Sequence, residues 1–173
     1  MGRPRSSWLP GLVAGLAIWA AGTALPAQEG LALSKGQTLY VPVYSHIYWG
    51  PKQRVFDLAC TLSIRNVDPS EAITIVSVDY FNTEGKRIRS FLQKPLVVPP
   101  LGTKEYYIEE KDTAGGSGAN FLVRWSAAGE VNPPIVECVM IGVQAAQGVS
   151  FTSRGRVILD HPREPAAPAK GAH

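Results

Sequence analysis

Charged residues are scarce in this chain: Asp, Glu, Lys and Arg make up 18% of its 173 residues, against roughly 25% in an average soluble protein. The formal net charge is only +3, and Arg3 and Arg5 belong to a leader discussed below. Binding to nucleic acid needs a concentrated basic face, so nucleic acid is excluded as an expected partner. The apolar fraction of 45% is ordinary, which excludes a disordered polyelectrolyte and predicts one folded domain.

Histidine is scarce as well, with three in the whole chain. His161 and His173 fall in the terminal segment, which leaves His46 as the one histidine of the central part. A Ser-His-Asp triad would have to use His46, yet the sequence contains no Gly-x-Ser-x-Gly nucleophile motif. The Cys and His residues do not cluster in the sequence, so no zinc site is predicted. We expect no catalysis and no cofactor; the alternative is a metal-dependent or hydrolytic envelope enzyme that uses His46 with the acidic segment 109–112 and the glycine-rich loop after it.

The sequence also lacks an apolar run long enough to cross a membrane. The stretch from Trp8 to Ala21 is shorter than the roughly 20 residues that a transmembrane helix needs. It follows Arg3 and Arg5 and precedes small residues, which is the order of a secretory signal. We predict a signal peptide over residues 1–27, with cleavage after Ala24 as the competing site and a retained anchor as the weaker alternative. The mature protein is then periplasmic or secreted, and it meets the membrane only through the leader during export.

The last residues, 161–173, are rich in proline and alanine and hold almost nothing large to bury. Such a composition predicts a disordered tail. The remaining body, residues 33–160, has a size that suits one β-sandwich or one small barrel.

Within this body the dominant hydrophobic period is two. In the segment 55–65 every second side chain is apolar, and this phase consists of Phe56, Leu58, Cys60, Leu62 and Ile64. The alternation predicts a half-buried strand. Residues 66–70 follow with the Asn, Asp and Pro composition of a turn.

Other segments have the same character, and no window of the body has the period of a helix. Further strands are predicted over residues 72–81, 86–92, 96–98, 104–109, 119–127, 135–144 and 149–158. The segment 40–44 carries Pro42 and is expected at a sheet edge, because proline cannot donate to a central ladder. The predicted fold is an all-β, antiparallel β-sandwich of about eight strands, immunoglobulin-like in preference to a barrel.

Several phrases of the body, taken together, are similar to one family. They lie at residues 40–48, 62–66, 115–121, 132–137 and 150–156, and they resemble the exported bacterial proteins grouped as domain of unknown function 3124. The resemblance runs from about Tyr40 to Ile158. It implies a bacterial origin and export. It implies no activity, ligand or catalytic residue, so function has to be argued from sites.

The least ordinary loop is a glycine-rich segment before the strand at 119–127. Its small and polar members are Gly115, Gly116, Ser117, Gly118 and Asn120. Three glycines in such a short span allow several backbone N–H groups to turn toward one anion. The segment lacks the Gly-Lys-Ser/Thr ending of a phosphate loop, and no helix follows it. Two interpretations remain: a long mobile hairpin loop, or a recognition site for an anion or a peptide.

Two arginines extend this second interpretation. Arg154 and Arg156 share one face of the predicted strand 149–158 with Thr152. Paired outward guanidinium groups suit a bidentate contact with carboxylate or phosphate. The alternative is an ordinary solvated face.

An aromatic segment offers a different surface. If the first strand stays regular past Ser45, one phase carries Tyr40, Tyr44, His46 and Tyr48, and the core phase carries Ile47 and Trp49. Exposed tyrosines stack on sugars or pack against a partner, because each has an apolar body and a polar tip. The alternative is that these side chains cover the edge of the sandwich. For Trp49, which precedes Gly50, both interpretations stay open.

The two cysteines, Cys60 and Cys138, both lie on inward phases of predicted strands. In an exported chain this placement predicts a disulfide between strands or layers. The alternative is two separate buried thiols, because a sequence does not give the distance between their Cα atoms.

These observations favour an exported, non-catalytic binding or scaffolding module. Its expected partner is an envelope protein, a peptide or a glycan. The candidate binding residues are those of the aromatic segment, the glycine-rich loop and the arginine pair.

Overall fold

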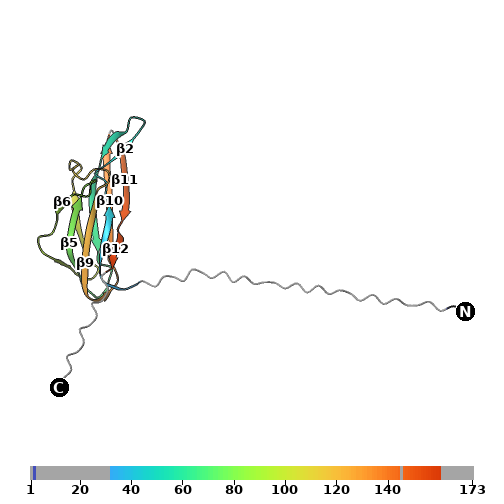
Figure 1. Ribbon diagram of the computed structural model, residues 1–173, viewed down its shortest axis with the longest axis vertical. Coiled ribbons are helices and arrows are strands. Elements are labelled where there is room, and N and C mark those ends of the chain that lie inside the picture. Colours follow the sequence, from blue (N-terminus) through green and yellow to red (C-terminus); the bar gives the residue numbers. More distant parts are fainter. Residues whose placement is uncertain (1, 3–31, 145, 161–173) are drawn as a thin grey trace, which may run out of the picture. The chain divides into compact units, whose positions relative to one another are not determined.

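The computed structural model describes Gly2 and residues 32–144 and 146–160 of the chain (Figure 1). The strands are β1 (Ser34–Pro42), β2 (His46–Trp49), β3 (Arg54–Asp57), β4 (Ala59–Arg65), β5 (Ile73–Phe81), β6 (Arg87–Ser90), β7 (Leu96–Val98), β8 (Thr103–Ile108), β9 (Asn120–Val131), β10 (Ile135–Gln144), β11 (Gln147–Arg154) and β12 (Arg156–Asp160). The predicted signal peptide, apart from Gly2, and the predicted tail lie outside the described residues. In the described ranges, no helix is long and apolar enough to span a membrane.

The strands form two main sheets and one ribbon. The six-stranded sheet has the order β12-β1-β9-β5-β6, with β7 also paired to β5, and the four-stranded sheet has the order β11-β10-β4-β8. The ribbon consists of β2 and β3, and every pair in the three sheets is antiparallel. Figure 1 shows the sheets face to face, with the ribbon at one end. The predicted all-β, antiparallel sandwich is confirmed, although the described residues form twelve strands and not about eight.

The core lies between the two sheets. Leu62 and Ile64 of β4 face Ile75 of β5 and Val123 and Trp125 of β9, and all five are fully buried. These residues are inward because successive side chains of a strand point to opposite faces. Burial of each large apolar side chain contributes about 1.5–3 kcal/mol.

The predicted strand at 55–65 is divided at Leu58. β3 pairs with β2, whereas β4 pairs with β10 and β8 in the four-stranded sheet. Between them the N–H of Leu58 donates to the carbonyl of Ser45 at 2.9 Å. The alternation of inward side chains continues through the break, so the sequence pattern alone does not reveal it.

The predicted strand at 149–158 is also divided, at Gly155. β11 pairs with β10, whereas β12 pairs with β1 in the other sheet. Gly155 makes the crossing, and its N–H donates to the carbonyl of Val136 at 2.8 Å. The expectation that Arg154 and Arg156 share one face of one strand is therefore wrong, because the two residues belong to different sheets.

The expected edge position of the segment 40–44 is confirmed only after Tyr40, where the pairing with β12 ends. β1 lies between β12 and β9 in the six-stranded sheet. Its proline is tolerated because β12 pairs only with residues from Gln37 to Tyr40. Pro42 is the last residue of β1 and lies beyond that pairing, where no N–H is needed.

Cys60 and Cys138 are free, buried thiols, so the predicted disulfide is not formed and the alternative interpretation holds. The two residues lie on the neighbouring strands β4 and β10, where Cys60 is opposite Met140 and Cys138 is opposite Leu62. They are diagonal neighbours and not a directly facing pair. A hydrogen bond with Cys60, followed by burial, raises the pKa of the Cys138 thiol far above its ordinary range.

The turn after β4 is held by Asp68. Its Oδ1 accepts from the backbone N–H groups of Ser70 and Glu71 at 3.0 and 2.9 Å. Its Oδ2 accepts from the N–H of Asn132, in the distant connection between β9 and β10, at 3.0 Å. These bonds, above all the one from Asn132, hold the pKa of the carboxyl well below its ordinary value of 3.8. The charged form of Asp68 therefore ties two connections together.

Candidate functional site

The aromatic candidates do not share one strand, because the regular strand ends at Pro42 and not past Ser45. Tyr40 is on β1, in the interior of the six-stranded sheet. Tyr44 follows β1 and packs edge-to-face on Phe151, with ring centroids 5.7 Å apart. The predicted aromatic surface of four residues is therefore divided.

His46 and Tyr48 remain together on β2. His46 Nε2 and Tyr48 Oη are 3.1 Å apart, and their rings are in edge contact at 5.2 Å. No three His, Cys, Asp or Glu side chains gather as metal ligands in the part of the chain that the structure describes. The acidic segment contributes an ion pair instead, in which Asp112 Oδ2 lies 2.7 Å from Arg89 Nη2.

The glycine-rich loop is anchored to its neighbours. The carbonyl of Gly115 accepts from the backbone N–H of Thr83 at 2.9 Å, and that of Gly116 accepts from Ser45 N–H at 3.1 Å. Gly116 N–H donates to the Thr113 carbonyl at 3.2 Å, and Gly118 N–H donates to Thr83 Oγ1 at 3.1 Å. These two N–H groups are used within the protein, so they do not form an anion nest.

The other residues of the predicted anion or peptide site lie in or next to strands of the two sheets. Ser117 is half-buried. Asn120 is the first residue of β9 and lies between Pro42 of β1 and Phe81 of β5. Arg154 lies opposite Glu137 of β10, whereas Arg156 lies opposite Tyr40 of β1. The arginine pair is therefore divided between the two sheets.

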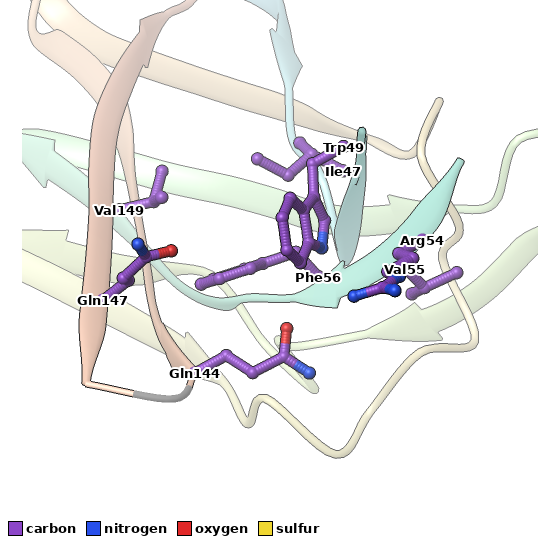
Figure 2. A pocket seen from close by; sticks show the side chains of 8 residues that line it. All are labelled: Ile47, Trp49, Arg54, Val55, Phe56, Gln144, Gln147 and Val149. Atoms are coloured by element: carbon purple, nitrogen blue, oxygen red, sulfur yellow. The ribbon is translucent and has the colours of Figure 1, made fainter. Parts of the chain in front are cut away.

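A pocket lies instead between the β2–β3 ribbon and the β10–β11 hairpin. Its volume is about 350 Å³, and its lining consists of Ile47, Trp49, Arg54, Val55, Phe56, Gln144, Gln147 and Val149. We call it the ribbon pocket. Figure 2 shows the rings of Trp49 and Phe56 at its centre, with Gln147 and Val149 on one side and Arg54 and Val55 on the other. Ile47 and Trp49, which the sequence assigned to the core phase, line this pocket.

The ribbon is brought to the hairpin by a close approach at Gly142 of β10. A Cβ atom at this position would lie 2.5 Å from the carbonyl oxygen of Asp57 and 2.6 Å from Cε1 of Phe56. Any larger residue would push β3 away from β10. The ribbon turns at Gly50, which has φ of +69°, a conformation that glycine adopts without steric cost.

The ribbon pocket combines apolar walls with planar polar groups. The indole of Trp49 is 45% exposed, and the Arg54 guanidinium lies 5.5 Å from the centre of its ring. The exposed Gln144 and Gln147 carry amides, each of which can donate and accept. The lining contains no carboxylate, histidine, hydroxyl or thiol side chain. Its apolar walls and polar amides are those of a binding pocket.

Most of this pocket is not predicted from the sequence. The sequence pattern leaves two interpretations open for Trp49 and indicates no role for Arg54, Gln144 or Gln147. One signal was present: Gly142 stands inside a predicted strand, and an isolated glycine there often marks a close backbone approach.

Comparison with known proteins identifies a family but no activity. A family model described as a protein of unknown function, domain of unknown function 3124, matches residues 36–158. No curated protein matches the chain. A solved structure described as "Crystal Structure of Thermotoga maritima 1070" aligns with a TM-score of 0.42 and 9% identity, over 69% of this chain and 92% of that chain. A likeness of this degree supports no conclusion about function.

Proposed function

We propose that this chain, which belongs to the family of proteins of unknown function with domain 3124, is an exported, non-catalytic binding module that holds a polypeptide partner in the ribbon pocket. The observation that carries the proposal is the exposed indole of Trp49, placed over an apolar pocket with two glutamine amides at its mouth.

The side chains of the pocket suit a polypeptide. Trp and Arg are enriched among residues that dominate binding energy at protein interfaces, and here the Arg54 guanidinium lies over the ring of Trp49. The apolar walls accept an apolar or aromatic side chain. The amides of Gln144 and Gln147 can bond to the N–H and C=O groups of an extended backbone.

The size of the pocket limits what it holds. A volume of about 350 Å³ is at the lower end of the roughly 300–1,000 Å³ of small-molecule pockets. It accommodates one or two anchor side chains and not a whole domain. The rest of the partner would therefore lie along the exposed ribbon and hairpin.

Calorimetric titration tests the proposal. The probe is an acetylated and amidated peptide with one central phenylalanine among alanines, and the competing probe is a trisaccharide of N-acetylglucosamine. Trp49→Ala is expected to weaken peptide binding by at least about tenfold, which corresponds to roughly 1.4 kcal/mol. Tyr107→Ala is the matched control, because Tyr107 of β8 is a comparably exposed aromatic residue outside the ribbon and does not line the pocket.

Two results would overturn this function. The first is equal peptide binding by the native protein and the Trp49→Ala variant. The second is binding of the trisaccharide alone, which would assign the pocket to a glycan.

A further inference from the structure

A second groove lies where the chain crosses from one sheet to the other. β11 ends at Arg154 opposite Glu137, and the next residue, Gly155, bonds to the carbonyl of Val136 and leads into β12 of the other sheet. The part of β10 before Glu137 is therefore without a β11 neighbour. A groove of about 490 Å³ occupies this position. We call it the crossing groove.

The floor of the crossing groove is apolar. Leu39 of β1 and Val136 of β10 are 4% exposed each, and Val157 of β12 closes the side at 48% exposure. Pro133 and Pro134 line the groove before β10 and carry no backbone N–H. An apolar side chain is the group that this floor accepts.

The rim of the groove carries an excess of positive charge. Arg65 and Arg154 both line it, together with one carboxylate, that of Glu137. Arg65 Nε lies 3.6 Å from Glu137 Oε1, and Arg154 is directly opposite Glu137 across the β10–β11 ladder. Among the described residues, the Glu137 carboxylate is within ion-pair distance of Arg65 but not of Arg154. The Arg154 guanidinium is therefore available to a carboxylate from a ligand.

A polar atom of the groove is unsatisfied. Gln37 lines the groove and is only 8% exposed. Its Oε1 accepts no hydrogen bond from the described residues. Buried acceptors are almost always bonded, and rotation of the terminal amide would offer this one to an N–H donor in the groove.

We propose that the crossing groove binds the carboxyl-terminal residue of an extended polypeptide. Its carboxylate pairs with Arg154 and Arg65, its side chain packs on Leu39, Val136 and Val157, and its backbone N–H donates to Gln37 Oε1. The last residue of a polypeptide carries these three groups together. A phosphate ion has no apolar group, and a fatty acid has no N–H. This site is separate from the ribbon pocket and does not depend on its function.

The test compares two probes that differ only at the carboxyl end. They are acetyl-Ala-Ala-Val with a free carboxylate and the same peptide with a terminal amide. Binding is followed by amide NMR shifts of the full chain. The acid is expected to bind at least about tenfold more tightly than the amide, since a guanidinium–carboxylate contact is lost in the amide.

Arg154→Ala and Arg156→Ala make a matched pair, because each removes one exposed arginine beside Gly155 but only Arg154 lines the groove. Arg154→Ala is expected to reduce affinity for the acid at least about tenfold, and Arg156→Ala less than about twofold. Trp49→Ala is expected to leave the acid bound, which separates this result from a failure at the ribbon pocket. Equal binding of acid and amide, equal effects of the two arginine variants, or complete displacement by inorganic phosphate or by laurate would each overturn the proposal.

Discussion

The glycine-rich loop and the β2–β3 ribbon are two connections with opposite relations to the core. The loop covers Tyr80, which is fully buried, and it bonds to Thr83 and Ser45 on its two sides. The ribbon holds Trp49 and Tyr48 at 45% and 55% exposure and approaches the sheet closely at Gly142. In this molecule the glycines of the loop mark close packing, whereas the exposed aromatic rings of the ribbon mark a surface that can bind a partner.

The two segments differ because the loop leaves no free space around the buried Tyr80, whereas the ribbon leaves its own large side chains uncovered. Tyr80 Oη is 3.0 Å from Ser45 Oγ, and the ring of Tyr80 lies 5.0 Å from that of Phe121. Burial raises the pKa of Tyr80, because the charged phenolate would lose its hydration there. The loop is fitted around this neutral side chain. The ribbon carries large apolar groups that its own fold leaves uncovered, so a partner can bury them.

The largest loss of stability is expected when the packing of the glycine-rich loop is disrupted. In Gly115→Ala the new Cβ atom would overlap the hydroxyl of Tyr80, and the variant is expected to lose about 3 kcal/mol of stability through overpacking. Gly129→Ala is the matched control, since nothing lies within 4 Å of a Cβ atom there, and its change is expected to stay within about 0.5 kcal/mol. Denaturant unfolding measures both. Equal stability of the two variants would contradict the packing role of the loop.

The next largest loss of stability is expected at Gly142, where the ribbon approaches β10 closely. Gly142→Ala brings a Cβ atom to 2.5 Å from the carbonyl oxygen of Asp57, and we expect a loss of about 2 kcal/mol. Displacement of β3 also disturbs the ribbon pocket, so peptide binding is expected to weaken in parallel. Urea unfolding and calorimetry measure the two effects. Unchanged binding in a destabilised variant would show that the ribbon does not depend on Gly142 for its position.

A third effect is expected at the turn held by Asp68, which is a tightly bonded connection like the glycine-rich loop. The pKa of this carboxyl is below its ordinary value of 3.8 in the folded protein, so the unfolded chain takes up the proton first as the pH falls. Stability is therefore expected to decrease as the pH drops through about 4 and below, and to be retained above it. Thermal unfolding between pH 3 and pH 7 measures this. Asp68→Asn should be less stable at pH 7 and should show a smaller dependence on pH; an unchanged slope would remove Asp68 as its source.

The smallest change in stability is expected for a substitution on the exposed face of the ribbon. Tyr48→Ala removes a side chain that is 55% exposed and whose main ring contact is with His46 at 5.2 Å. We expect a change within about 0.5 kcal/mol. Denaturant unfolding of Tyr48→Ala and Gly115→Ala under the same conditions compares the stability loss at the exposed ribbon with that at the packed loop. A loss comparable with that of Gly115→Ala would show that Tyr48 is needed for packing, as the glycine-rich loop is.

Much of the fold could be predicted from the sequence, because the alternation of side chains is a local property. The inward positions of Leu62 and Ile64 on β4 and of Cys138 on β10 follow from a period of two, and all three are buried. The turn at Asp68 follows from residue types that bond to their own backbone. For Trp49, a large aromatic residue beside Gly50, the sequence left both a core position and a binding surface open.

The tertiary structure alone decided which strands are neighbours. A period of two continues through Leu58 and across Gly155, although the chain leaves one sheet at each point. The ribbon pocket joins residues near position 50 to a hairpin tip near position 145, and the crossing groove joins Gln37 to Arg154. Local patterns carry no signal for such pairs, because the energy that selects them comes from contacts between residues about a hundred positions apart.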